Sequence, residues 1–100
     1  MRPDYCDVNQ LKERIDPVDF YTNEGQEIRS GGNAAWKEAG LCPFHEDRNA
    51  GSFYIHTRQG GYHCFACRAK GGDIIAFIQQ KYSLSFREAV HKLQNDWGVV

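Results

Sequence analysis

The chain has 100 residues, of which 41% are hydrophobic and 13% aromatic, and 13 acidic and 12 basic side chains leave a net charge of −1. This length predicts one globular domain spanning residues 1–100, and the near-neutral charge excludes a histone-like polyanion binder. No apolar run approaches the roughly 20 residues that span a bilayer, and residues 1–5 do not resemble a signal peptide. We therefore expect a cytoplasmic protein with no membrane partner. A chain of this length has a small hydrophobic core, which needs an additional stabilising link.

The first predicted element is a helical segment at about residues 7–22. Val8, Leu11 and Ile15 recur at helical spacing after Asp7, a candidate N-cap, and this pattern ends before Pro17. Val18, Phe20 and Tyr21 then indicate a second apolar turn. Glycine, serine and asparagine then predict a loop over residues 23–33.

Short strands are predicted at residues 34–39, 52–57 and 62–65. The last two flank residues 58–61, which contain two glycines and indicate a hairpin turn. Because side chains alternate along a strand, Phe53 and Ile55 should lie on one face of the sheet, with Tyr54 and His56 on the other. We expect the first face to be core and the second to contact water.

Two helices are predicted at about residues 73–97. Asp73 is a candidate N-cap for a short helix that closes around Tyr82, and Ser85 with Glu88 forms a capping-box pattern before a second helix. Gly98 marks the end of that helix. Its apolar stripe consists of Phe86, Ala89, Val90, Leu93 and Trp97.

Four residues have the spacing of a metal site. Cys42 and His45 are separated by two residues, as are Cys64 and Cys67, and 18 residues lie between the two pairs. A hairpin of that length returns the second pair to the first, and three thiolates with one imidazole suit a tetrahedral zinc ion. With all four positions filled by protein, the ion has no site for substrate water, so we expect one structural Zn²⁺ in a zinc ribbon at about residues 34–70.

Other histidines and cysteines fit the site less well. His63 lacks the paired spacing and is expected at the surface, whereas Cys6 lies outside both pairs and is expected as a small apolar side chain or a free thiol. The alternative to zinc is a disulfide or a chance pairing of the cysteines.

The order of these motifs resembles one family. Gly40 to His45 reads GLCPFH, residues 62–67 read YHCFAC, and residues 71–77 read GGDIIAF. Together with LKERIDPVD at residues 11–19 and LSFREAV at residues 84–90, this pattern resembles the N-terminal zinc-binding domain of bacterial and phage-type DNA primases, the CHC2 zinc finger.

The resemblance carries several implications. It implies an α+β fold, a small zinc ribbon on an antiparallel β-sheet with flanking helices, and the ligands Cys42, His45, Cys64 and Cys67. It also implies a module that engages single-stranded DNA template in primer synthesis for DNA replication. A separate primase catalytic domain would be its partner, with the replicative helicase as a further partner. The chain lacks carboxylates spaced for catalytic magnesium, so we expect no catalysis by it alone.

Binding to a single strand requires cations beside aromatic faces. Residues 58–70 carry three basic side chains and no acidic one. The candidate nucleic-acid contacts are Trp36, Lys37, Tyr54, Arg58, Tyr62, Arg68 and Lys70. Phe53, Phe65, Phe77 and Trp97 are expected in the core, while Trp36, Tyr54 and Tyr62 fit either role.

Two functions remain open at this stage. The first is the primase module, and the second is a free-standing zinc-ribbon protein of a phage or mobile element that binds a protein partner or nucleic acid without a priming role. A redox enzyme is the weaker third alternative, because only Cys64 and Cys67 form a C-x-x-C motif and no thioredoxin-like pattern surrounds them.

Overall fold

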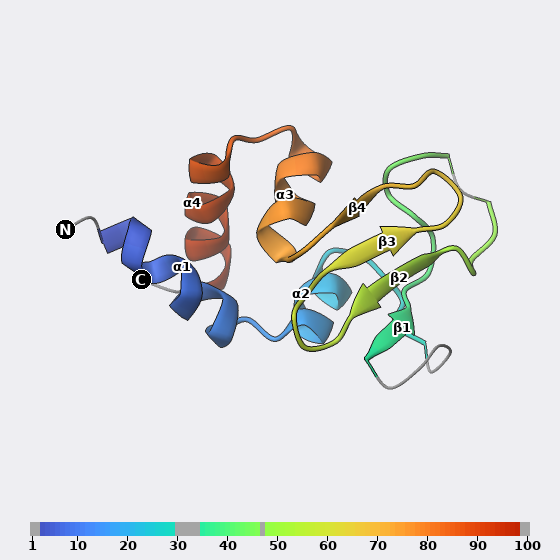
Figure 1. Ribbon diagram of the computed structural model, residues 1–100, viewed down its shortest axis with the longest axis horizontal. Coiled ribbons are helices and arrows are strands. Elements are labelled where there is room, and N and C mark those ends of the chain that lie inside the picture. The colour runs from blue at the N-terminus through green and yellow to red at the C-terminus, as the bar shows by residue number, and fades with distance from the viewer. Residues whose placement is uncertain (1–2, 30–34, 47, 99–100) are drawn as a thin grey trace.

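The computed structural model describes residues 3–29, 35–46 and 48–98, with only the backbone of residues 3–7. Within these residues, four helices and a four-stranded antiparallel sheet form an α+β fold, which confirms the predicted class (Figure 1). The helices are α1 (Pro3–Arg14), α2 (Pro17–Asn23), α3 (Ile74–Tyr82) and α4 (Phe86–Trp97). The strands are β1 (Trp36–Glu38), β2 (Phe53–His56), β3 (Tyr62–Cys64) and β4 (Lys70–Gly71), paired in chain order.

The N-terminal region contains two helices. α1 begins at Pro3, so Asp7 lies inside it and the predicted N-cap is wrong. α1 ends before Pro17 as expected, and Asp16 caps α2 by accepting a hydrogen bond from the Asp19 N–H at 3.1 Å. Cys6 lies in α1, and its side chain is outside the described residues.

The predicted hairpin is present, and its strands are shorter than expected. β2 pairs with β3 so that Tyr54 lies opposite His63, and residues 57–61 form the turn. Phe53 and Ile55 are buried whereas Tyr54 and His56 are partly exposed, which confirms the predicted alternation. The two-residue strand β4 was not predicted, because Lys70 and Gly71 have no apolar pattern and pair through the backbone alone. Ala34, the first residue of the predicted first strand, lies outside the described residues.

The C-terminal helices follow the predicted boundaries. Asp73 caps α3 by accepting from the Ala76 N–H at 2.9 Å, and the capping box of Ser85 and Glu88 starts α4. Gly98 ends α4 in the left-handed conformation. One residue of the predicted stripe differs, since Phe86 is 51% exposed at the first position of α4.

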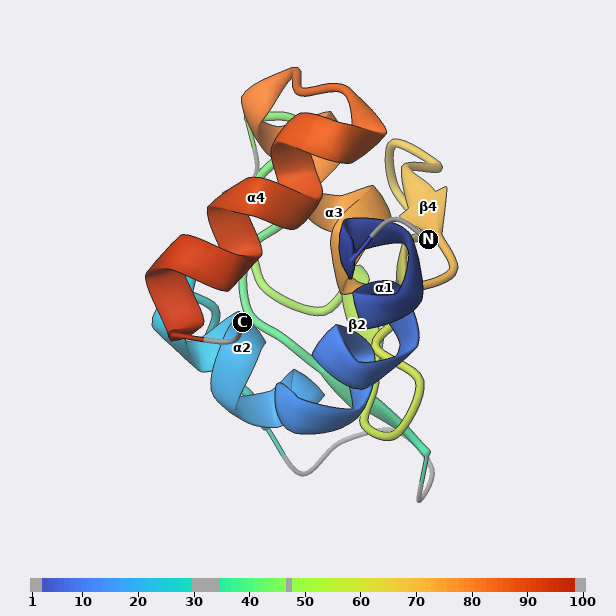
Figure 2. The same ribbon diagram turned by 90° about the vertical axis from the view of Figure 1, so that its left-hand side faces the viewer.

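Aromatic side chains from the helices and the sheet meet in one core. Phe77 of α3 packs at ring-centroid distances of 4.8 Å from Tyr21 and 5.3 Å from Tyr62. The buried hydroxyl of Tyr21 donates to the Gly60 carbonyl at 2.7 Å and so joins α2 to the β2–β3 turn. Figure 2, seen from the helical end, shows α1 and α4 next to each other, in keeping with their contacts. Within the described part of the chain, no helix has the length and apolar character needed to cross a membrane.

Candidate metal centre and the open face of the sheet

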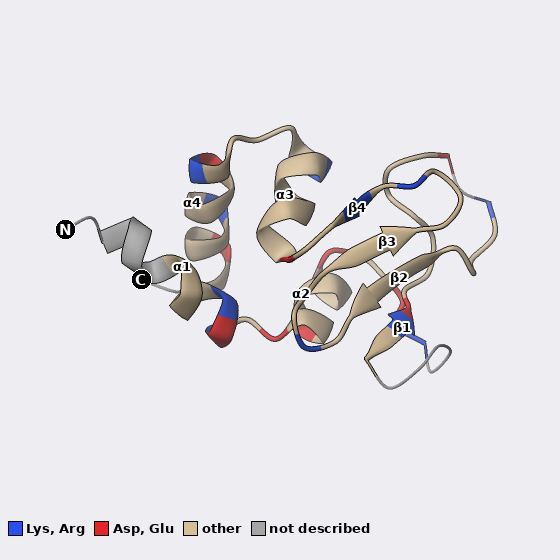
Figure 3. Cartoon of the chain, in the orientation of Figure 1, with Lys and Arg blue, Asp and Glu red and all other residues tan. Residues whose placement is uncertain are grey.

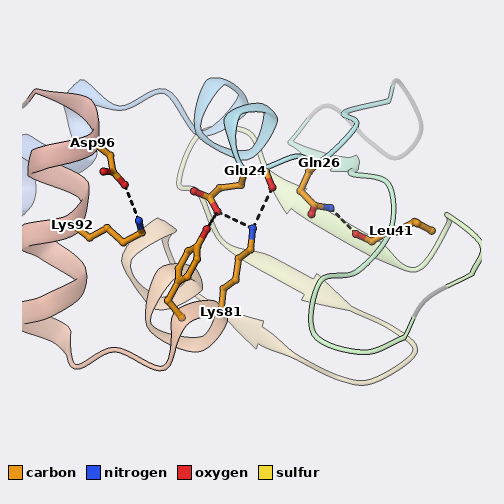
Figure 4. A network of polar contacts seen from close by, with 7 residues as sticks. Glu24, Gln26, Leu41, Lys81, Lys92 and Asp96 are labelled. Carbon is orange, nitrogen blue, oxygen red and sulfur yellow. Dashed lines mark hydrogen bonds and ion pairs between the residues drawn. The ribbon is translucent and has the colours of Figure 1, made fainter.

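The first metal-binding turn is held by the loop before it. The buried Gln26 side chain donates from Nε2 to the backbone carbonyls of Ala39 and Leu41, the latter at 2.7 Å (Figure 4). Gly40 adopts a φ of 72°, and a Cβ there would lie 3.1 Å from the Glu27 backbone nitrogen. This segment therefore enters the turn at Cys42 in a fixed conformation. Sequence reasoning missed Gln26, because a polar residue in a loop has no pattern that marks it as buried.

The second metal-binding turn follows β3 directly. The Arg68 N–H donates to the Cys64 carbonyl at 2.8 Å, and the Cys64 N–H donates to the Ala69 carbonyl at the same distance. Arg68 closes the turn with a φ of 67°, in the left-handed region. The β3–β4 connection thus brings Cys67 back beside Cys64.

The two turns bring the four predicted ligands together. The candidate ligand atoms of Cys42, His45, Cys64 and Cys67 all lie within 4.8 Å of one another. Cys42 Sγ lies 3.8 Å from Cys67 Sγ, and Cys64 Sγ lies 3.5 Å from His45 Nε2. Among the residues that the structure describes, no other group of three or more His, Cys, Asp or Glu side chains is placed to hold a metal ion.

These separations fit a tetrahedral zinc ion. With Zn–S bonds of about 2.3 Å and Zn–N bonds of about 2.0 Å, two sulfurs lie about 3.8 Å apart, and a sulfur and a nitrogen lie about 3.5 Å apart. Three sulfurs and one imidazole also form a donor set that zinc prefers over magnesium or calcium. The cluster therefore fits one structural zinc ion with a closed first coordination shell.

The cysteine thiols have unlike electrostatic environments. Desolvation raises the pKa of Cys42 to about 12. Desolvation also acts to raise the pKa of Cys64, but hydrogen bonds from the Cys67 and Ala66 backbone N–H groups outweigh it and lower that pKa to about 7. A bound divalent cation would favour the thiolate at both positions, because metal ligation deprotonates thiols.

The zinc cluster is joined to the core through Phe44. This residue lies between Cys42 and His45, and its ring packs at 5.4 Å from both Tyr62 and Phe77. Its backbone N–H also lies 3.4 Å from Cys42 Sγ, in hydrogen-bonding geometry. The position of the first ligand pair is therefore coupled to packing between the sheet and α3.

Beside the cluster, one face of the sheet is partly exposed along all four strands. Strand register places aromatic, imidazole and charged side chains on this face, which we call the open face; it consists of Trp36, Glu38, Tyr54, His56, His63 and Lys70. His63 is partly exposed, and Phe65 stacks on its ring at 4.3 Å with an interplanar angle of 18°. Phe65 is 66% exposed, so its predicted place in the core is wrong.

The predicted nucleic-acid contacts do not all share this face. Trp36, Tyr54 and Lys70 lie on it, and Arg68 lies in the adjacent metal-binding turn. Tyr62 points to the core, is 2% exposed and donates its hydroxyl to Gln80 on α3, so it is removed from the predicted contacts. Register puts Lys37 on the same side as Ile55, opposite the open face.

Arg58 is also separated from the other predicted cations. It lies in the β2–β3 turn, at the end of the sheet away from the second metal-binding turn that holds Arg68 (Figure 3). The predicted single cluster of Arg58, Arg68 and Lys70 is therefore wrong. Arg58 and Arg68 are close in the sequence but lie at opposite ends of the sheet, because β3 runs between them.

Comparisons with known proteins agree with this geometry. The family model of the CHC2 zinc finger matches residues 4–100. The chain is 36% identical over 93 residues to DNA primase of Streptomyces coelicolor, covering 93% of this chain and 14% of that protein. It is 47% identical over 60 residues to DNA primase of Deinococcus radiodurans, covering 60% of this chain and 10% of that protein.

A solved structure shows the same fold. The crystal structure of the Aquifex aeolicus primase, which comprises zinc-binding and RNA polymerase domains, matches with a TM-score of 0.70 and 28% identity, covering 98% of this chain and 22% of that one. This chain spans about a seventh of the length of the first curated relatives that it matches. From the match over nearly all of its residues and from its Cys₃His cluster, we conclude that the chain belongs to the CHC2 zinc finger family.

Proposed function

We propose that this domain is a module of a DNA primase that engages single-stranded template DNA on the open face of its sheet. The observation that carries the proposal is the row of rings from Trp36 to Phe65 beside the basic side chains of Arg68 and Lys70. Bases stack on exposed rings with about 1–3 kcal/mol each, and cations track the phosphates. Relatives of this chain are named DNA primase, which supports a template as the ligand.

The rings form two groups on this face. Phe65 lies 5.6 Å from Tyr54 in an edge-on arrangement and stacks on His63, so a platform exists next to the zinc cluster. Trp36 lies edge-on to His56 at 5.1 Å near the other end of the face. A shallow groove lined by Trp36, His63 and Lys70 connects the two groups.

A salt titration tests this role. Fluorescence anisotropy with a short labelled oligo(dT) strand should show weak binding that falls with salt at a log–log slope of about −1.4, for about two phosphate contacts made by Arg68 and Lys70. Phe65→Ala and the Arg68→Ala, Lys70→Ala double variant should each weaken binding severalfold. Arg87→Ala on α4 is the matched control and should bind as wild type. Unchanged binding by both open-face variants would refute this DNA face.

The domain's contribution is positioning rather than chemistry. A zinc ion with four protein ligands has no position for substrate or water, and phosphoryl transfer requires metal ions free to contact phosphates. Holding template near a separate catalytic domain raises the local concentration of the productive complex, and two tethered weak contacts can gain about 10²-fold in avidity.

Addition in trans tests that contribution. The domain alone should make no primers, and its addition to the matching primase catalytic core should change primer yield or start sites mapped on a defined template. The Phe65→Ala variant should lose this effect, whereas Arg87→Ala should keep it. No change on addition of the wild-type domain would instead favour a free-standing zinc protein that binds another partner.

A further inference from the structure

A second recess lies beyond the end of the open face, where the β2–β3 turn meets the end of α1. It measures about 800 Å³ and is lined by residues that include Lys12, Arg14, Arg58, Gln59, Gly72 and Asp73. Figure 3 shows charged residues gathered where these segments approach each other. The recess therefore unites the displaced Arg58 with two basic side chains of α1.

Two of the carboxylates that line this recess are already engaged at helix starts. Asp16 accepts from the Asp19 N–H at the start of α2, and Asp73 accepts from the Ala76 N–H at the start of α3. Asp73 also pairs with Lys12 at 3.2 Å. The positive end of each helix offsets the charge of its cap, so these acidic groups oppose an incoming anion less than their number suggests.

The two arginines of the recess are available to a ligand. Arg14 and Arg58 are exposed, and in the described part of the chain neither forms an ion pair. The turn that carries Arg58 is fixed, because the backbone N–H groups of Arg58 and Gln59 donate to His56 Nδ1 at 3.3 and 3.0 Å. Glu13 also lines the recess and keeps it from being a strong general anion site.

The recess adjoins the groove on the open face. Gly72 lines both, and a Cβ placed there would meet no atom within 4 Å. Gly71 beside it is different, since a Cβ would lie 2.5 Å from the Tyr62 ring. The passage between the two sites thus runs over an unobstructed backbone at Gly72.

We propose that this recess is a second subsite for the phosphodiester backbone of a single DNA strand, which passes from the open face over Gly72 to Arg14 and Arg58. Guanidinium groups suit this role because they bind phosphate through two parallel hydrogen bonds. The inference rests on the proposed function and concerns the length of strand that the domain binds. Short strands occupy the open face, and longer strands also contact the recess.

A length series separates the two subsites. Anisotropy with oligo(dT) strands from about 4 to about 16 nucleotides should show tighter binding by wild type once the strand spans both sites. The Arg14→Ala, Arg58→Ala double variant should bind long strands about 3- to 10-fold more weakly than wild type. The slope of log K against log salt should become less steep by about 1.4, for two lost phosphate contacts. Short strands should bind as they do to wild type. Gly72→Gln adds bulk without charge and should weaken binding of long strands by blocking the passage, with Gly72→Ala as its matched control.

The outcomes distinguish the proposals. Zinc content and thermal unfolding of each variant must match wild type, and a Cβ at position 72 meets no atom within 4 Å, so the Gly72 variants should fold. If the recess variants bind long strands as wild type while Phe65→Ala weakens every length, the second subsite is refuted and the open face stands. If Phe65→Ala and the Arg68→Ala, Lys70→Ala double variant also bind as wild type, both proposals fail together.

Discussion

Glu24, which follows α2, accepts three hydrogen bonds from α3. Its Oε1 accepts hydrogen bonds from Lys81 Nζ and Tyr82 Oη, both at 2.8 Å, and the same Lys81 nitrogen donates to the Glu24 carbonyl at 3.2 Å (Figure 4). The Glu24 side chain is 9% exposed. Removal of one partner from such a site leaves a charge with little water around it, which costs more than the contact itself contributes.

Removal of the Lys81 charge tests this difference. Lys81→Met keeps the aliphatic stem and should lower the free energy of unfolding by about 2 kcal/mol, because the Glu24 carboxylate loses a charged donor. Asp96→Asn is the matched control: Asp96 pairs with Lys92 at 3.0 Å within α4 and is 46% exposed, and such pairs contribute under about 1 kcal/mol. Urea unfolding followed by circular dichroism measures both, and equal losses would contradict the argument.

Among the elements, α4 depends on local capping at both ends. Ser85 Oγ accepts from the Glu88 N–H at 3.1 Å, Glu88 accepts from the Ser85 N–H at 2.9 Å, and Gly98 closes the helix. The hydrogen bond from the Ser85 backbone lowers the pKa of Glu88. A capping box satisfies two backbone donors that the helix leaves unpaired.

Loss of the cap should therefore be measurable. Ser85→Ala should lower the free energy of unfolding by about 1 kcal/mol, while Ser85→Asp retains an acceptor at the same position and should stay close to wild type. Thermal unfolding of the zinc-loaded protein measures both variants. A loss in Ser85→Asp as large as that in Ser85→Ala would show that the cap does not carry the effect.

The elements predicted best from the sequence are those specified locally. The capping box, the Asp73 cap and the alternation of Phe53 with Tyr54 each depend on residues within four positions of each other. The paired ligands were predicted for the same reason, since each turn is short. β4 could not be predicted, because its two residues are defined only by pairing with Tyr62 and His63.

The errors at the site have one physical cause. Sequence proximity grouped Arg58 with Arg68 and Lys70, but strand direction separates them, and strand alternation sends Tyr62 inward and His63 outward. Phe65 was expected in the core from its hydrophobicity alone, whereas the tight turn from Cys64 to Cys67 turns it toward His63. Tertiary position, not residue type, decides which of these rings a ligand can reach.

On the scale of the whole molecule, the metal-binding turns pack directly against the aromatic core. Phe44 extends from the first metal-binding turn to Tyr62 and Phe77, and Phe77 in turn contacts Tyr21 of α2. A chain of 100 residues has a small core, and zinc adds folding free energy only in the state that holds its ligands together. Loss of the metal should therefore unfold the helices as well as the zinc ribbon.

Zinc removal tests this coupling. Cys64→Ser, or chelation of wild type, should remove one equivalent of zinc and abolish the cooperative unfolding transition, with loss of helical circular dichroism as well as sheet signal, because the ligand pair no longer fixes Phe44 against α3. Cys6→Ser is the control and should retain one zinc ion per chain and an unchanged midpoint. Metal analysis by mass spectrometry and thermal unfolding measure both variants. A Cys64→Ser protein that keeps its zinc and its transition, or a wild-type protein that contains two disulfides and no zinc, would contradict a fold that depends on the metal.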